Sequence, residues 1–84
     1  MKTLHLTLMK RWFDEILAGT KKVEYRDIKP YWTKRLLDDI GNPKKYDLII
    51  FKNGYNKNSP TMKVECKGLL IKEKYEILLG DIKS

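Results

Sequence analysis

Four charged side chains lie close together in the segment from Gly19 to Arg26, which reads Gly-Thr-Lys-Lys-Val-Glu-Tyr-Arg. In an extended strand alternate side chains share one face, so Lys22, Glu24 and Arg26 are expected to project together. The Glu24 carboxylate would then orient the Arg26 guanidinium, whose planar fork of donors matches a phosphate or a base edge. The alternative is a solvated, charged strand face with no ligand.

Lys21 would face the other side of an ideal strand from this group. It joins the group only if the chain from Gly19 to Lys21 is irregular, and a glycine after a helix favours such a turn. Lys21 beside Glu24 would supply a cation and a base, which are the groups that RNA cleavage through the ribose 2′-hydroxyl requires. Lys21 and Glu24 are therefore the candidate catalytic residues if the protein is a hydrolase.

Aromatic and amide side chains elsewhere suit contacts with unpaired bases. Trp32 is expected at the start of a helix just after the charged segment, where core packing and base stacking are both open. Asn53, Tyr55 and Lys57 combine an amide, an aromatic ring and a cation in one loop, and the alternative there is an ordinary long hairpin loop. The candidate nucleic-acid-binding residues are Lys21, Lys22, Glu24, Arg26, Trp32, Asn53, Tyr55 and Lys57.

Three other reactive or aromatic residues are expected to be structural. His5 alternates with apolar residues and has no partner for a metal site. Cys66 is the only cysteine, which excludes an intramolecular disulfide and a cysteine-based zinc site, and its spacing predicts a buried thiol. Trp12 lies in the middle of an apolar helical stripe and is expected in the core. We therefore expect no metal and no cofactor.

The charge balance favours a polyanionic partner. The 84 residues include 18 Lys and Arg against 11 Asp and Glu, a formal net charge of +7. Neutralising phosphates releases condensed counterions, so such a domain suits RNA, single-stranded RNA first, or a nucleotide, with DNA also open. The alternatives are a merely soluble basic surface and a basic face for an acidic protein partner.

Nothing in the sequence indicates a membrane or an export signal. The longest apolar run, 48–51, is far shorter than the roughly 20 residues of a spanning helix. The first residues alternate polar and apolar side chains, whereas a signal peptide needs a continuous apolar stretch. We therefore expect a cytoplasmic protein.

The first half of the chain predicts two strands and two helices. Alternation over 3–8 and 22–26 indicates strands, with Val23 and Tyr25 opposite the charged face of the second. A first helix is expected to end at Ala18-Gly19, and Pro30 is suited to the first turn of a second, which Gly41-Asn42-Pro43 would stop. The two expected apolar stripes are Met9, Trp12, Phe13, Ile16 and Leu17, then Trp32, Leu36, Leu37 and Ile40.

The second half of the chain predicts strands. One is expected over about 46–52, followed by a polar loop at 53–60 and a strand over 62–67. Gly68 is expected to mark a bulge or bend, and 69–79 would supply one or two more strands. So few strands protect their edges best by curling, so we predict one α+β domain over 1–84: a small mixed β-barrel of five or six strands with two helices.

The pattern Gly19-x-Lys21-x-x-Glu24-x-Arg26 resembles the signature of the ASCH domain, a member of the PUA-like superfamily. The resemblance extends over nearly the whole chain, through the second helix with Pro30 and the strand and turn at 51–55. It implies a small PUA-like β-barrel, with the signature lining a cleft between barrel and helices, and RNA binding.

Some relatives in that wider family are ribonucleases or amidohydrolases that act on acetylated cytidine. In the amidohydrolases a lysine activates a nearby threonine, and Lys21 matches that lysine. Glu24 stands where the threonine would be, and a carboxylate does not readily form the same acyl intermediate. The resemblance therefore favours a binding module, with hydrolysis of RNA or of a modified nucleoside as the alternative.

Overall fold

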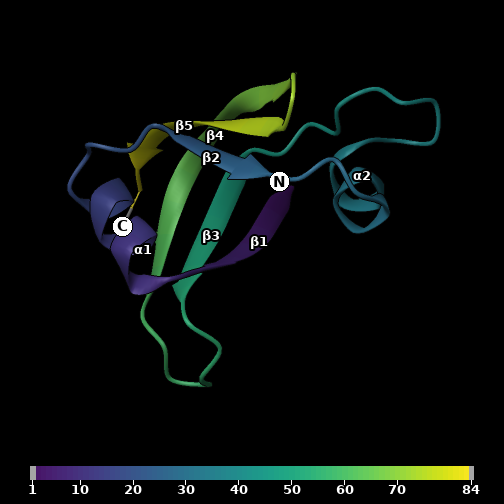
Figure 1. Cartoon of the computed structure of the whole chain (residues 1–84). Coiled ribbons are helices and arrows are strands. Elements are labelled where there is room, and N and C mark those ends of the chain that lie inside the picture. Colours follow the sequence, from purple (N-terminus) through teal and green to yellow (C-terminus); the bar gives the residue numbers. More distant parts are fainter. Residues whose placement is uncertain (1, 84) are drawn as a thin grey trace.

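The structure is a computed structural model that describes residues 2–83, and it contains one five-stranded sheet and two helices (Figure 1). The chain runs through the elements in the order strand, helix, strand, helix and three strands. Their bounds are β1 Thr3–Leu8, α1 Lys10–Leu17, β2 Val23–Arg26, α2 Pro30–Leu36, β3 Leu48–Asn53, β4 Thr61–Ile71 and β5 Tyr75–Ile82.

The sheet is mixed and curled. Its strand order is β1-β3-β4-β5-β2, with β1 and β3 parallel and the other neighbours antiparallel. The α+β class, the two helices and the strand number of the sequence prediction are confirmed, but the sheet forms a half-barrel instead of a closed barrel. The sheet stays open because its two edge strands, β1 and β2, do not pair with each other. Strand β2 has only four residues, and all four pair with β5.

The apolar core fills the inner face of the half-barrel. Leu4 pairs in register with Ile49, and Leu6 pairs with Phe51, so one alternating set of side chains faces inward from two adjacent strands. Helix α1 contributes two side chains to this core and α2 contributes one. The buried apolar residues are Leu4, Leu6, Leu8, Phe13, Ile16, Leu36, Ile49, Phe51, Met62, Val64, Tyr75, Ile77 and Leu79.

Helix α1 ends just before Ala18-Gly19, as the sequence predicts. Gly19 has φ +81°, and the backbone N–H groups of Thr20 and Lys21 both donate to the Glu15 carbonyl, so the chain leaves the helix in a tight turn. The expected apolar stripe is only partly buried: Met9 and Leu17 are exposed. The short helix rests on the sheet through its central turn, so the residues at its two ends extend beyond the contact.

Helix α2 is shorter than the sequence predicts. It ends at Leu36, Leu37 is extended, and Ile40 is exposed and does not join the expected stripe. The reason is Asp38, whose Oδ1 accepts hydrogen bonds from the backbone N–H groups of Ile40 and Asn42. This local turn competes with continuation of the helix.

Strands β4 and β5 form a hairpin, and its bulge lies at Gly68, as the sequence predicts. The pairing of β4 with β5 shifts between Val64 and Cys66 and again between Cys66 and Gly68, and Gly68 has φ +143°. Residues 69–71 continue β4 instead of starting a new strand. Cys66 is half-buried, less than expected, because it lies at this irregular position. Between residues 2 and 83 neither helix is long and apolar enough to cross a membrane.

Candidate functional site

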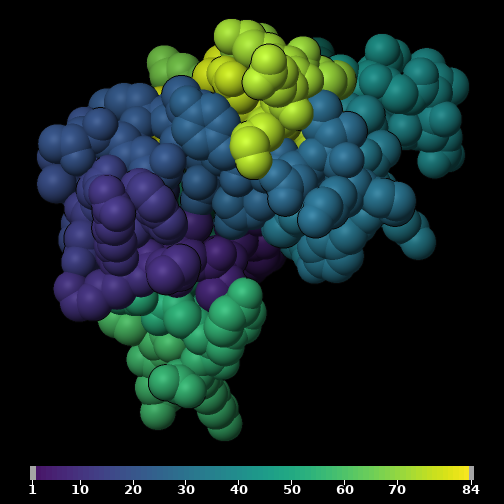
Figure 2. Space-filling view, in the orientation of Figure 1, coloured from purple at the N-terminus to yellow at the C-terminus, as the bar shows by residue number. Residues whose placement is uncertain are grey.

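A cleft of about 880 Å³ opens between the two edge strands of the half-barrel. Strand β1 forms its floor, β2 and helices α1 and α2 form its sides, and the β3–β4 loop reaches its mouth. In Figure 2 the hollow lies between the purple α1 segment, the blue β2 and α2 segments and the green loop. The lining residues are His5, Leu6, Thr7, Leu8, Met9, Trp12, Lys21, Glu24, Tyr25, Arg26, Tyr31, Trp32, Arg35 and Tyr55.

Glu24 occupies a core-facing position of β2. It pairs in register with Ile77, whose side chain is buried, and Glu24 itself is only 5% exposed. The predicted alternation holds within β2 and not for Lys22, which precedes the strand, is exposed and does not share the side of Glu24 and Arg26 as expected. The charged face is also not a solvated one: Glu24 points inward, and Tyr25 is 46% exposed. A carboxylate at such a position costs stability unless cations and donors surround it, and Lys21, Arg26 and the Tyr25 backbone N–H lie around this one.

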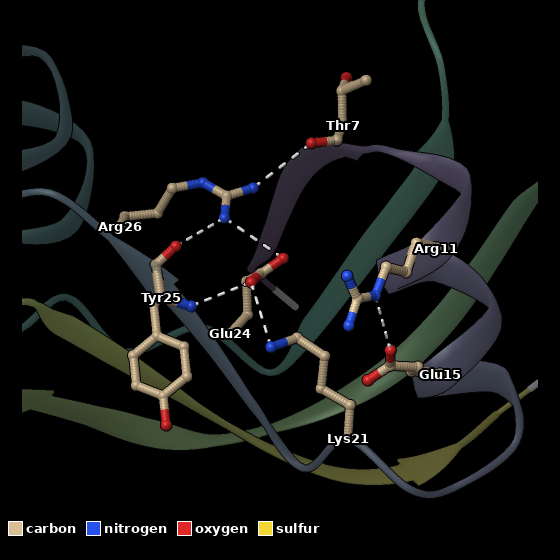
Figure 3. A network of polar contacts seen from close by, with 7 residues as sticks. All are labelled: Thr7, Arg11, Glu15, Lys21, Glu24, Tyr25 and Arg26. Atoms are coloured by element: carbon tan, nitrogen blue, oxygen red, sulfur yellow. Dashed lines mark hydrogen bonds and ion pairs between the residues drawn. The ribbon is translucent and has the colours of Figure 1, made fainter.

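The Glu24 carboxylate is only partly satisfied by its neighbours (Figure 3). Its Oε1 accepts a hydrogen bond from the Tyr25 backbone N–H at 3.0 Å, and the Lys21 Nζ lies 3.7 Å from the same oxygen. The Arg26 Nη1 lies 3.2 Å from Oε2. That contact is an ion pair without hydrogen-bond geometry, so the buried Oε2 accepts no hydrogen bond from any residue between 2 and 83. One strong acceptor therefore remains uncommitted beside the cleft.

Lys21 joins Glu24 because the chain before β2 is irregular. The residue lies in the turn after α1 and not in β2, so its side chain reaches the same side as Glu24. In an ideal strand it would point to the opposite side. Its Nζ lies 5.0 Å from the centre of the Trp12 ring and 5.1 Å from that of Tyr25, within range of cation–π attraction. The lysine side chain is 13% exposed. The expectation that Lys21 could join the charged group is confirmed.

Two arginines bind the open edge of β1. The Arg26 Nη1 donates to the Tyr25 carbonyl at 2.7 Å, and its Nη2 donates to the Thr7 carbonyl at 3.4 Å, so the side chain spans from β2 to β1. The Arg35 Nη2 donates to the His5 carbonyl at 3.0 Å from helix α2. These guanidinium groups satisfy carbonyls that an edge strand otherwise presents to solvent. The arginines thus close the seam with side chains where the sheet lacks backbone pairing.

Aromatic rings form the walls and rim of the cleft. Trp12 packs against the core, as expected, but it is only half-buried and also lines the cleft. The Lys21 and Arg11 cations lie over its ring. Trp32 is also half-buried and lies 5.0 Å from the Arg26 guanidinium carbon. Tyr25, Tyr31 and Tyr55 at the rim are 46%, 61% and 90% exposed.

The structure brings five of the eight predicted binding residues to the cleft: Lys21, Glu24, Arg26, Trp32 and Tyr55. Lys22, Asn53 and Lys57 do not line it. Sequence reasoning missed Arg35, whose Nη1 donates to the Tyr31 hydroxyl at 2.8 Å. The signal was the spacing of four residues between Tyr31 and Arg35 on one helix.

The charge of the lining is positive on balance. Lys21, Arg26 and Arg35 stand against the single carboxylate of Glu24. His5 is exposed at the rim, and no three His, Cys, Asp or Glu side chains within the described chain gather as a metal ion would require. Such a lining attracts an anion through the cations while it offers a carboxylate to a hydrogen-bond donor.

Two titratable groups outside the cleft have shifted pKa values. A hydrogen bond and charge attraction from Lys74, together with the charge of Lys29, lower the pKa of Asp27 and tie the end of β2 to the β4–β5 turn. Burial raises the pKa of the Cys66 thiol, which disfavours the reactive thiolate form. Neither group belongs to the cleft.

Comparison with known proteins adds no relative: no family model, no curated protein and no solved structure matches the chain. The residues of the cleft and their geometry are therefore what indicates a function for the chain.

Proposed function

We propose that the protein is an RNA- or nucleotide-binding module that holds its ligand in the cleft between β1 and β2. The observation that carries the proposal is the buried Glu24 carboxylate between Lys21 and Arg26, with an oxygen that accepts no hydrogen bond from the described chain. A nucleotide offers what this arrangement lacks: base N–H donors for the carboxylate and phosphate oxygens for the cations.

The remaining walls of the cleft support a nucleotide over a simple anion. Trp12 and Trp32 supply apolar ring surface inside the cleft, and Tyr31 and Tyr55 offer exposed rings at its mouth. Aromatic rings at such positions stack bases of a single strand without requiring a particular sequence. The volume of about 880 Å³ is in the range of small-molecule sites, so one nucleotide unit fits inside. The ASCH-like pattern from Gly19 to Arg26 agrees with this assignment.

The test is a titration of the protein with fluorescently labelled single-stranded RNA at low ionic strength, followed by anisotropy. We expect affinity that falls as salt rises, and Lys21→Met and Arg26→Met each to weaken it about tenfold or more. Lys22→Met is the matched control, because Lys22 is exposed, adjacent in sequence and outside the cleft. No binding to RNA, DNA or nucleotides, or equal losses in all three variants, would contradict the proposal.

Hydrolysis of RNA or of an acetylated cytidine is a second candidate, because the Lys21 Nζ lies 3.7 Å from the Glu24 carboxylate. In that case Glu24 acts as the base and Lys21 neutralises developing charge. Incubation with labelled RNA and with acetylated cytidine tests it. Turnover by the parent protein that is lost in Glu24→Gln, while binding persists, would establish catalysis. Equal amounts of product from the parent protein and from Glu24→Gln would exclude it.

A further inference from the structure

Three of the four charged side chains that line the cleft, those of Lys21, Glu24 and Arg26, form a row with the carboxylate at its centre. Figure 3 shows Glu24 in the centre, with the Arg26 guanidinium on one side and the Lys21 ammonium on the other. In hydrogen-bonding terms the order is donor, acceptor, donor. A ligand complementary to this row presents acceptor, donor and acceptor along one edge.

Each member of the row keeps hydrogen-bonding capacity that the protein does not use. Glu24 Oε2 accepts no hydrogen bond from residues 2–83, and the Lys21 ammonium donates none to the residues that the structure describes. Arg26 donates to two backbone carbonyls and has further N–H groups to offer. The ion pairs of Glu24 with Lys21 and with Arg26 carry no hydrogen bond, so a ligand that separates these groups slightly breaks none between them.

The geometry points to a cyclic imide edge as the ligand: we propose that the cleft reads the O=C–NH–C=O edge of a uracil ring. Glu24 Oε2 is itself buried against the Arg26 guanidinium, so the ligand would part the two groups. The imide N–H would then donate to Oε2, and its two flanking carbonyl oxygens would accept from Lys21 and Arg26. This inference rests on the proposed nucleotide binding and names the base that the cleft selects.

The other RNA bases do not fit the same row. Cytosine and adenine place a ring nitrogen acceptor at the centre of their pairing edge, where it would face the Glu24 carboxylate. Guanine places a second donor beside its central N–H, where it would face Lys21 or Arg26. Each mismatch leaves like groups opposed in a site that is 6% to 15% exposed at its charged side chains, so water cannot relieve it cheaply. Uracil alone among the four bases satisfies all three positions.

The surrounding side chains place the ring. Trp12 and Tyr25 flank Lys21, and Trp32 lies against Arg26, so aromatic surface adjoins both ends of the row. Arg35 lies in the same cleft and has N–H groups beyond those it gives to Tyr31 and to the His5 carbonyl, which suits the phosphate attached to the base.

The experiment compares uridine, cytidine, adenosine and guanosine 5′-monophosphates, and short oligouridylate with oligocytidylate, by quenching of the fluorescence of the cleft tryptophans. Uridine ligands should bind about tenfold tighter than the others, a difference expected for one well-made base contact. Methylation of the uracil N3 removes the donor and should erase that advantage. Equal affinity for all four bases would overturn the inference and leave nucleotide binding intact, while no binding by any ligand would overturn both.

Glu24→Gln tests the role of the carboxylate itself. The amide keeps the shape but replaces the charge, so the preference for uridine over cytidine should fall to about twofold or less. Glu73→Gln is the matched control, because Glu73 is exposed in the β4–β5 turn and outside the cleft. Thermal unfolding of both variants checks that they fold. A folded Glu24→Gln protein that keeps the full uridine preference would overturn the inference.

Discussion

The Arg26 guanidinium lies 3.2 Å from Glu24 Oε2, yet it donates its hydrogen bonds to the Tyr25 and Thr7 carbonyls instead. The arginine therefore has two roles at one position. It neutralises a buried carboxylate, and it connects β1 with β2, the two edge strands, which do not pair with each other. A ligand that engages Arg26 or Glu24 acts at the seam of the half-barrel.

Arg26→Met should destabilise the fold. The change leaves the Glu24 carboxylate with Lys21 as its remaining ion-pair partner and removes the hydrogen bond to Thr7, so the free energy of unfolding should fall by about 2–3 kcal/mol. Urea denaturation measures it. Lys22→Met should stay within about 0.5 kcal/mol of the parent, as expected for an exposed site. A loss for Arg26→Met as small as that of the control would contradict the bridging role.

Phe51→Ala should be the more damaging change of two aromatic truncations. Phe51 is 0% exposed on the inner face of β3, and its removal leaves a cavity that costs about 3–5 kcal/mol. Tyr55→Ala, at a residue that is 90% exposed, should change the free energy of unfolding by less than about 0.5 kcal/mol. Similar midpoints of chemical unfolding for the two variants would show that the core is assigned wrongly.

Gly68→Ala should weaken the β4–β5 hairpin. With φ +143° the position suits glycine alone, and a side chain there should cost about 1–3 kcal/mol although nothing crowds the added methyl group. Lys67→Ala next to it is the comparison, because that side chain is exposed and its ion pair with Glu65 is weak. If both variants melt at the same temperature, the bulge does not require glycine.

Cys66 should react slowly with iodoacetamide. Burial raises the pKa of its thiol, so at pH 8 the thiolate fraction is small in the folded protein, and alkylation should be about tenfold faster in urea. Because the folded pKa lies above the unfolded one, the protonated thiol favours the fold at neutral pH. That contribution is lost as the pH rises through the folded pKa. Equal alkylation rates with and without urea would contradict the burial of the thiol.

Most elements of the fold are predictable from the sequence because they depend on local patterns. The alternation in 3–8 and the turn at Gly19 both appear where the residues indicate them. The length of α2 is not predictable from its apolar spacing, since the turn that Asp38 forms replaces the last helical turn. Curling of the sheet is predictable, but its closure depends on long-range pairing of β1 with β2, which no local pattern encodes.

The sequence predicts the central residues of the site, but it does not predict which face of β2 points into the half-barrel. Spacing alone places Glu24 and Arg26 on one face of a strand, but it does not show that this face is the inner one. Arg35 acts on the His5 carbonyl, 30 residues away in sequence. The His5 carbonyl is free to accept this hydrogen bond because β1 is an edge strand. Which strand lies at the edge is determined only when the whole sheet assembles.

The most direct test of ligand binding in the cleft is the change of amide and indole N–H signals in nuclear magnetic resonance spectra on addition of uridine 5′-monophosphate. Both tryptophans, Trp12 and Trp32, line the cleft, so their indole signals should shift together with the backbone signals of Lys21 to Arg26. The exposed β4–β5 turn at 72–74 should stay unchanged as an internal control. Shifts that spare both indoles and concentrate elsewhere on the surface would contradict the assignment of the cleft as the binding site.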